Sequence, residues 1–199
     1  MGRVSREQAG RNRERVLATA CRLFRQYGVE NVSIADIMKE AGLTPGGFYK
    51  QFASKEALVD EAFESAFAQS SRSWERIGKH HDAEPFQGLH ALVRRYFKHR
   101  PREPGCPMLV FSSLVGGLSA DPQATAIYSD GVRKLYEQFM AAASRAPDER
   151  GPETLTDADM MVLFAAMVGA GMLTRAMGET AFTRQLQSAV LGALPEPRH

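Results

Sequence analysis

The chain has 199 residues, 44% hydrophobic and 24% charged, an ordinary composition for a globular protein with enough material for one large or two small cores. Its two cysteines, Cys21 and Cys106, lie far apart and argue against a disulfide framework, and its polar, arginine-rich start lacks the apolar stretch of a signal peptide. We therefore expect a cytoplasmic protein rather than a secreted one.

Positive charge is concentrated at the start of the chain, although the net charge is only +2. Residues 1–55 hold ten Lys and Arg against five Asp and Glu, whereas residues 56–199 hold fifteen against eighteen. This split is typical of a basic head that faces a polyanion and a body that does not. A basic segment can also be a merely solvated face. A DNA-binding motif within the segment is therefore needed to distinguish the two interpretations.

The first predicted helix runs from about Arg11 to Tyr27 and ends at Gly28. Apolar side chains recur along it at helical spacing and predict a buried stripe of Val16, Ala20, Leu23, Phe24 and Tyr27. Cys21 lies beside this stripe, and we interpret it as a packing residue. The arginines along this stretch fit either phosphate contacts or a solvated arm: Arg3, Arg6, Arg11, Arg13 and Arg15.

Two short helices joined by a glycine turn are predicted next. Ser33 is a good N-cap for the first, whose apolar residues Ile34, Ile37 and Met38 have helical spacing. Gly42 tolerates the left-handed backbone of the turn, and Thr44 and Pro45 suit the cap and first position of the second helix. This pattern predicts a helix-turn-helix, in which the second helix enters the major groove of DNA.

The second helix carries the glycine pair Gly46-Gly47, and each glycine costs about 1 kcal/mol relative to alanine. Glycine allows a close approach to another surface, and DNA is such a surface. Phe48 and Phe52, four residues apart, would anchor the helix to the core. The residues expected to face outward are Thr44, Gly46, Gly47, Tyr49 and Lys50.

A long helix should follow, with Ser54 as its cap and Lys55 placed for a phosphate contact. It would link the head mechanically to the body. The stretch from Gly78 to Pro85 is predicted to be a loop, and its adjacent His80 and His81 are expected to be solvated rather than metal ligands.

Further helices are predicted over about 86–99, 121–143, 157–176 and 179–194, with a polar linker over 145–156. The apolar run from Met160 to Thr174 is too short and glycine-rich to span a membrane comfortably, and predicts a buried helix. Small residues in the last two helices suit a four-helix dimer interface, two helices from each protomer. An internal core without a partner is the alternative.

Cys106 precedes Pro107 at a predicted helix start, where amide dipoles can favour a thiolate. It is therefore either a sensor of electrophiles or oxidants, or a thiol that only packs.

The residues from Val29 to Leu58 resemble the DNA-binding domain of the TetR family of bacterial transcriptional regulators, on Ser33, Ile37, Ala41-Gly42, Gly47-Phe48-Tyr49, Phe52 and Ser54-Lys55-Glu56. The resemblance covers about residues 11–65. It implies an all-α protein, with a three-helix helix-turn-helix domain over 1–55 and a helical ligand-binding and dimerisation domain over 56–199. It also implies a homodimer formed through the two C-terminal helices.

The resemblance further implies a repressor that leaves a near-palindromic DNA operator when a small hydrophobic or electrophilic effector binds. It assigns DNA contacts to Ser33, Thr44, Pro45, Gly46, Gly47, Tyr49, Lys50 and Lys55. The apolar pocket for the effector is expected among Phe67, Trp74, Phe97, Cys106, Met108, Phe111, Tyr128 and Phe139. No phosphate loop, metal-ligand spacing or nucleophile elbow occurs in the sequence, so we expect neither an enzyme nor a cofactor or metal. A helical adaptor whose basic head binds protein is the alternative.

Overall fold

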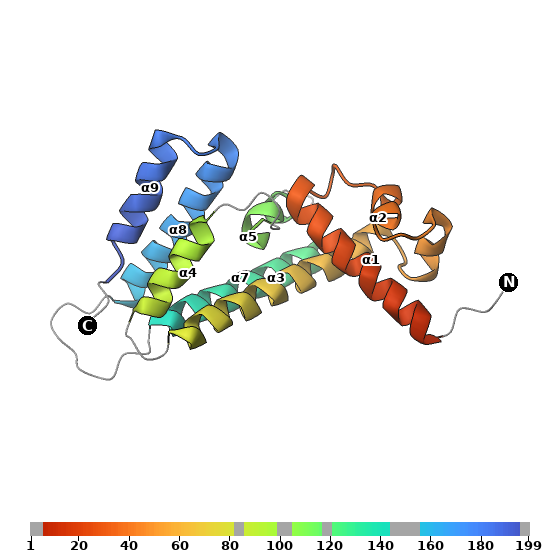
Figure 1. The fold of residues 1–199 in the computed structure, drawn as a ribbon, viewed down its shortest axis with the longest axis horizontal. Helices are drawn as coiled ribbons and strands as arrows, with labels where there is room; N and C mark the ends of the chain where they lie inside the picture. The colour runs from red at the N-terminus through yellow and green to blue at the C-terminus, as the bar shows by residue number, and fades with distance from the viewer. Residues whose placement is uncertain (1–5, 82–85, 99–104, 117–120, 144–155, 196–199) are drawn as a thin grey trace. The chain divides into compact units, whose positions relative to one another are not determined.

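The computed structural model describes residues 6–81, 86–98, 105–116, 121–143 and 156–195 (Figure 1). All regular secondary structure in these ranges is helical, which confirms the predicted all-α fold. The elements are α1 (Arg6–Tyr27), α2 (Ile34–Glu40), η1 (Pro45–Lys50), α3 (Lys55–His80), α4 (Gln87–Phe97), α5 (Pro107–Val110), α6 (Ser112–Val115), α7 (Pro122–Ala143), α8 (Asp157–Met177) and α9 (Ala181–Gly192).

The chain divides into two compact units. The N-terminal unit comprises residues 1–69 and 102–132, and the C-terminal unit comprises residues 70–101 and 133–199. Both α3 and α7 begin in the N-terminal unit and end in the C-terminal unit. The functional division expected at residue 55 stays a prediction.

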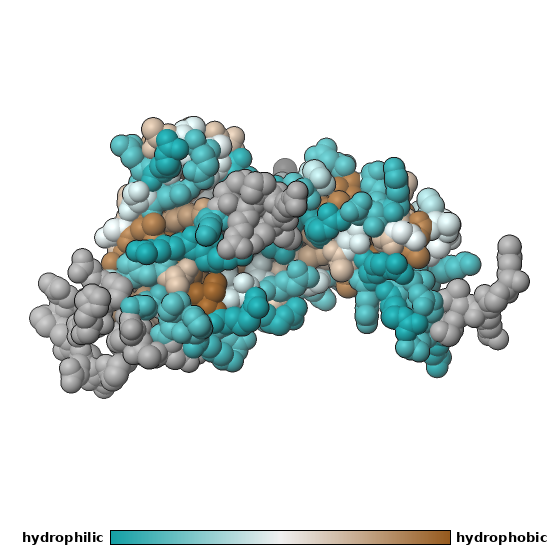
Figure 2. All heavy atoms as spheres, in the orientation of Figure 1, coloured by the Kyte–Doolittle hydropathy of each residue, from teal (hydrophilic) through white to brown (hydrophobic). Residues whose placement is uncertain are grey.

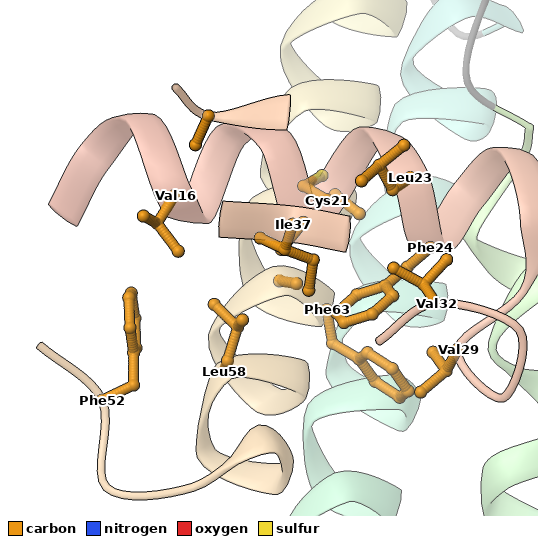
Figure 3. Packing of buried hydrophobic residues seen from close by; sticks show 14 of the residues in the cluster. Val16, Cys21, Leu23, Phe24, Val29, Val32, Ile37, Phe52, Leu58 and Phe63 are labelled. Atoms are coloured by element: carbon orange, nitrogen blue, oxygen red, sulfur yellow. The ribbon is translucent and has the colours of Figure 1, made fainter. Parts of the chain in front are cut away.

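The core of the N-terminal unit is built from α1, α2 and α3, whose apolar side chains converge in Figure 3. Val16, Phe24, Ile37, Leu58 and Phe63 are completely buried in it. The stripe predicted on α1 is therefore confirmed for the residues from Val16 to Phe24.

Two details of α1 differ from the prediction. The helix begins at Arg6 rather than near Arg11, because pairs four residues apart, Glu7 with Arg11 and Gln8 with Asn12, support its first turns. Tyr27 is 54% exposed rather than buried, since it is the last residue of the helix and the chain turns after it.

Residues far from the head in sequence complete the same core. Val110 and Phe111, from α5 and the residue after it, are buried in the cluster that contains the α1 and α2 side chains. The rings of Phe63 and Phe111 lie 3.8 Å apart between centroids. The hydrophobic core of the N-terminal unit therefore includes part of the chain beyond residue 100.

In the C-terminal unit, α8 and α9 pack side by side with α4 against them (Figure 1). Both helices begin with capping boxes, formed by Thr156 with Asp159 and by Thr180 with Thr183. Gln187 Nε2 donates to Thr174 Oγ1 at 3.0 Å and ties α9 to α8.

Two further predictions about this part of the chain need correction. Residues 78–80 continue α3 instead of forming a loop, while residues 82–85 lie outside the described ranges, as does most of the predicted 145–156 linker. The apolar α8 is not buried all round in the single chain, because only one side of it packs, through Met160, Leu163, Met167 and Ala170.

Candidate nucleic-acid interface

The first helix of the predicted motif, α2, begins with a capping box. The Ser33 hydroxyl accepts from the Asp36 amide at 3.1 Å, and the Asp36 carboxylate accepts from the Ser33 amide at 3.0 Å and from its hydroxyl at 2.5 Å. These bonds stabilise the ionised carboxylate and lower the pKa of Asp36, and the bond from the Ser33 hydroxyl has the largest effect. The predicted Ser33 cap is confirmed.

The turn after α2 is left-handed at Gly42, where φ is +66°. The Gly42 amide donates to Lys39 O at 3.0 Å, and the Leu43 amide donates to Met38 O at 2.8 Å, so the last carbonyls of the helix are satisfied. A side chain at this φ would be strained, and glycine is the residue the turn requires. The turn therefore has the geometry predicted from the sequence.

The second helix of the motif is a 3-10 helix, η1, rather than an α-helix. Pro45 occupies its first turn as predicted, but the Thr44 side chain forms no cap hydrogen bond. A six-residue segment with two glycines has little intrinsic helix propensity, and tighter 3-10 turns are common in such short pieces.

Two phenylalanines hold η1 against the core. Phe48 is 0% exposed and Phe52 is 4% exposed, and their rings stack with centroids 5.6 Å apart. The Arg13 guanidinium of α1 lies over the Phe52 ring, 4.5 Å from its centroid. The predicted anchoring of the second helix by this pair is confirmed, so a short helix without good propensity is positioned by tertiary packing.

The opposite side of η1 forms what we call the recognition surface, made of Thr44, Pro45, Gly46, Tyr49 and Lys50, all exposed. Tyr49 is 70% exposed, although its ring edge contacts the buried Phe48 ring at 5.1 Å. Within the described residues, the Lys50 ammonium makes no ion pair or hydrogen bond, so its charge faces solvent. Gly47 is half-buried, and a Cβ there would contact Met38 Cε at 3.6 Å.

Gly46 differs from its neighbour, because a Cβ added to it would meet no atom within 4 Å. Its φ is not in the left-handed region either. Nothing within the described part of the chain therefore requires glycine at position 46. The missing side chain leaves the backbone of η1 open to approach from outside.

Lys55 begins α3, next to Ser54, whose hydroxyl accepts from the Ala57 amide at 3.1 Å and caps the helix as predicted. The Lys55 ammonium donates to Val29 O at 3.0 Å. An ammonium has three donors, so two stay available for an anion.

Part of the positive charge of α1 is balanced within the unit. Arg13 pairs with Glu61 of α3 at 2.6 Å, Arg22 pairs with Glu40 of α2 at 2.7 Å, and Arg11 pairs with Glu7. Hydrophilic side chains cover the N-terminal half of α1 in Figure 2. Arg13 and Arg22 therefore tie helices together as well as carrying charge, a role that sequence reasoning did not assign to them.

Five of the predicted effector residues lie in the N-terminal unit: Phe67, Cys106, Met108, Phe111 and Tyr128. The Phe67 and Tyr128 rings meet edge to face at 5.7 Å, and the Tyr128 hydroxyl donates to Met108 O at 2.8 Å. Burial raises the pKa of Tyr128, so this hydroxyl keeps its proton at neutral pH. Phe111 packs on Phe63, while Cys106 is half-buried at the N-cap of α5.

The other three predicted effector residues, Trp74, Phe97 and Phe139, lie in the C-terminal unit and are buried. Tyr96 contacts both Trp74 and Phe97, with ring centroids 6.1 and 5.8 Å away, respectively. Phe139 packs against Phe164 of α8 at 5.4 Å. Their role in ligand binding stays a prediction.

An exposed apolar face runs along α8 and the start of α9. Its large side chains are Met161, Val162, Met172, Met177 and Phe182, which are 57%, 67%, 55%, 50% and 51% exposed, respectively. By length and composition α8 could also cross a membrane, and it is the one helix in the described ranges of which this is true. Exposed apolar faces of this kind are typical of sites that bind another protein or a membrane.

Comparison with known proteins agrees with this geometry. Residues 16–62 match the family model described as bacterial regulatory proteins, tetR family. The HTH-type transcriptional regulator AcrR of Shigella flexneri is 39% identical over 64 residues, 32% of this chain and 30% of that protein. EthR of Mycolicibacterium smegmatis is 25% identical over 162 residues, 80% of this chain and 72% of that protein.

The similarity extends to whole structures. A TetR transcriptional regulator from Chloroflexus aurantiacus J-10-FL superimposes with a TM-score of 0.74 at 26% identity, covering 94% of this chain and 95% of that one. The fold and the recognition surface are those of a helix-turn-helix DNA-binding domain joined to a helical body. The family model over residues 16–62 and these relatives support a regulator of the TetR family. The chain spans 30% of the length of the first curated relative, AcrR, and 22% of the length of the second, YerO of Bacillus subtilis.

Proposed function

We propose that the protein is a repressor that binds a near-palindromic DNA operator as a homodimer and leaves it when a small hydrophobic or electrophilic molecule binds. The single observation that carries the DNA-binding part is the recognition surface. Buried Phe48 and Phe52 hold a short helix whose outer side presents Tyr49, Lys50 and a bare backbone at Gly46 to solvent.

In this proposal each residue of the motif has a distinct task. Pro45, Gly46, Gly47 and Lys50 face the groove, with Lys50 the residue that reaches a base edge, preferentially guanine. Ser33, Thr44, Tyr49 and Lys55 contact phosphates. The Ser33 amide and hydroxyl both donate to Asp36, so Ser33 reaches a phosphate only by exchanging one of these bonds. The Lys55 ammonium keeps two donors for a phosphate beside its bond to Val29 O.

Dimerisation is proposed through the exposed apolar face of α8 and α9. Regulators of this family typically bind DNA as dimers. One helix-turn-helix contacts few base pairs, and two of them related by a twofold axis read half-sites about 34–36 Å apart. Pairing would remove the exposed apolar side chains of α8 from water. A dimer interface therefore explains the apolar character of this helix, and no membrane span is needed to explain it. A cytoplasmic location follows from this reading.

Effector binding is proposed among the aromatic and sulfur-containing residues predicted from the sequence. Such responsiveness is typical of the family. An effector can weaken DNA binding by no more than the difference between its binding free energies for the DNA-bound and the released conformations. The Cys106 thiolate would be the nucleophile that reacts with an electrophilic effector. Regulators of this family are generally not enzymes, and we infer no catalytic activity.

The alternative is an adaptor whose basic head binds a protein, and salt dependence separates the two. Selection from a random duplex pool should return a near-palindrome, and affinity for it should fall steeply with salt. Lys55→Ala should lower the slope of log affinity against log salt by about one. Lys79→Ala is the control, because Lys79 pairs with Glu75 at 2.7 Å at the other end of α3 and should leave the slope unchanged. A salt-independent interaction without a selected sequence would refute DNA binding.

A further inference from the structure

A short segment of the N-terminal unit, residues 105–108, is held by hydrogen bonds from two different helices. The Arg25 Nε of α1 donates to Gly105 O at 2.7 Å. The Tyr128 hydroxyl of α7 donates to Met108 O at 2.8 Å. Backbone carbonyls three residues apart are thus held by side chains that come from α1 and from α7, on either side of this segment in the sequence.

Arg25 is an unusual residue to find at this place. It is 8% exposed, although it carries a charge, and charged side chains are seldom buried unless they are hydrogen-bonded. It also lies beside Cys21 on the same helix, where it opposes, without outweighing, the effect of burial that raises the pKa of that thiol. The guanidinium is therefore fixed by the fold and not a solvated surface charge.

The segment next to these carbonyls is packed into the core of the head. Phe111 is completely buried against Phe63 of α3, and Val110 is 8% exposed in the same cluster as the α1 side chains. A protein interior is too closely packed for one element to move without its neighbours. A displacement of residues 105–111 must therefore displace α1 or break the bond from Arg25.

Helix α1 in turn contacts residues that hold η1 and α2 in place. Arg13 of α1 lies over the Phe52 ring that anchors η1, and Arg22 of α1 pairs with Glu40 at the end of α2. The contacts thus continue from Tyr128 through the 105–111 segment and Arg25 to α1, and from α1 to both helices of the motif.

We propose that Arg25 and Tyr128 form a clamp on residues 105–108 that couples occupancy of the Met108–Tyr128 region to the position of the recognition surface. This inference rests on the proposed DNA-binding function. A ligand that accepts the hydrogen bond of the Tyr128 hydroxyl in place of Met108 O frees one end of the clamp, and Arg25 transmits the change to α1. Arg25 acts through other residues and contacts neither DNA nor ligand.

The test uses the full chain and needs no effector, because Tyr128→Phe removes one bond of the clamp and little else. We expect this variant to change the Kd for a selected duplex by about fivefold or more. In an Arg25→Met background the same substitution should change it less than about twofold, since residues acting through one network are not additive. Tyr136→Phe, a ring on the same helix packed against Phe164 at 5.3 Å, is the matched control and should leave Kd unchanged.

Amide hydrogen exchange supplies a readout that depends neither on DNA nor on the folding of the Arg25 variant. Tyr128→Phe should speed exchange in α1 and α2, and Tyr136→Phe should not. If both tyrosine variants behave alike in exchange and in Kd, the clamp is refuted. If the wild-type chain binds no duplex while Tyr128→Phe still alters exchange in α1, the proposed function fails and the mechanical coupling stands.

Discussion

Replacing Gly46 by alanine should separate what folding requires from what DNA binding requires. A Cβ at this position meets nothing within 4 Å in the described part of the chain, and φ at Gly46 is not positive. The substitution should therefore raise the free energy of unfolding by about 0.4–1 kcal/mol, since alanine has less backbone freedom to lose on folding. Denaturation in urea measures this change.

The same methyl group should weaken DNA binding, because it occupies the space through which a phosphate or base edge would approach the η1 backbone. Loss of one hydrogen bond to a charged group costs about 1.5–3 kcal/mol, which corresponds to a Kd weakened roughly tenfold to more than a hundredfold. Fluorescence anisotropy with a labelled duplex from the selected pool measures it. The variant would thus be more stable and less active.

Gly78→Ala is the control for this experiment. Gly78 lies in α3, away from the motif, and a Cβ there also meets nothing within 4 Å. It should show a similar gain in stability with no change in affinity. If Gly46→Ala binds the selected duplex as tightly as the wild-type chain does, no surface approaches that backbone, and the proposed orientation of η1 toward DNA is wrong.

Three further predictions concern other parts of the chain. Gly131→Ala should lower the free energy of unfolding, measured in urea, by about 1–3 kcal/mol, because its Cβ would overlap the Phe67 ring. If Phe67→Leu does not restore part of this loss, the explanation is wrong. Asp36→Asn should lower the melting temperature at pH 7: the lowered pKa of Asp36 stabilises the fold fully above the unfolded pKa of about 4, and melting curves of the two proteins should converge as pH falls through the folded pKa. Val162→Lys should yield a monomer in analytical ultracentrifugation, whereas the exposed-site control Ala68→Lys should remain a dimer, and a dimeric Val162→Lys protein would place the interface elsewhere.

Local features of the head were predictable because their causes lie within a few residues. The caps at Ser33 and Ser54, the left-handed turn at Gly42 and the anchoring by Phe48 and Phe52 all follow from side-chain chemistry at short spacing. The errors occur where local signals end. Tyr27 continues the apolar spacing of α1, but it is the last residue of the helix. Helical spacing alone does not show whether another segment packs over a terminal residue, and Tyr27 is exposed.

Some important residues could not have been identified from the sequence. Arg25 resembles any other arginine on a basic helix, and only the coordinates bring Gly105 O, eighty residues away, within 2.7 Å of it. Glu61 and Glu40 likewise became partners of Arg13 and Arg22 only after three helices had packed together. No spacing rule connects residues so far apart, because their proximity depends on the packing of whole helices.

The sequence by itself determined that the protein is all-α, where its motif lies and which side of η1 is apolar, since helix periodicity, caps and turn glycines act over a few residues. The tertiary structure decided which helices share a core, and therefore that residues 105–111 belong with the head. It also left one side of α8 uncovered. These outcomes depend on contacts between distant segments, because burial is a property of the packed molecule and not of any stretch of residues.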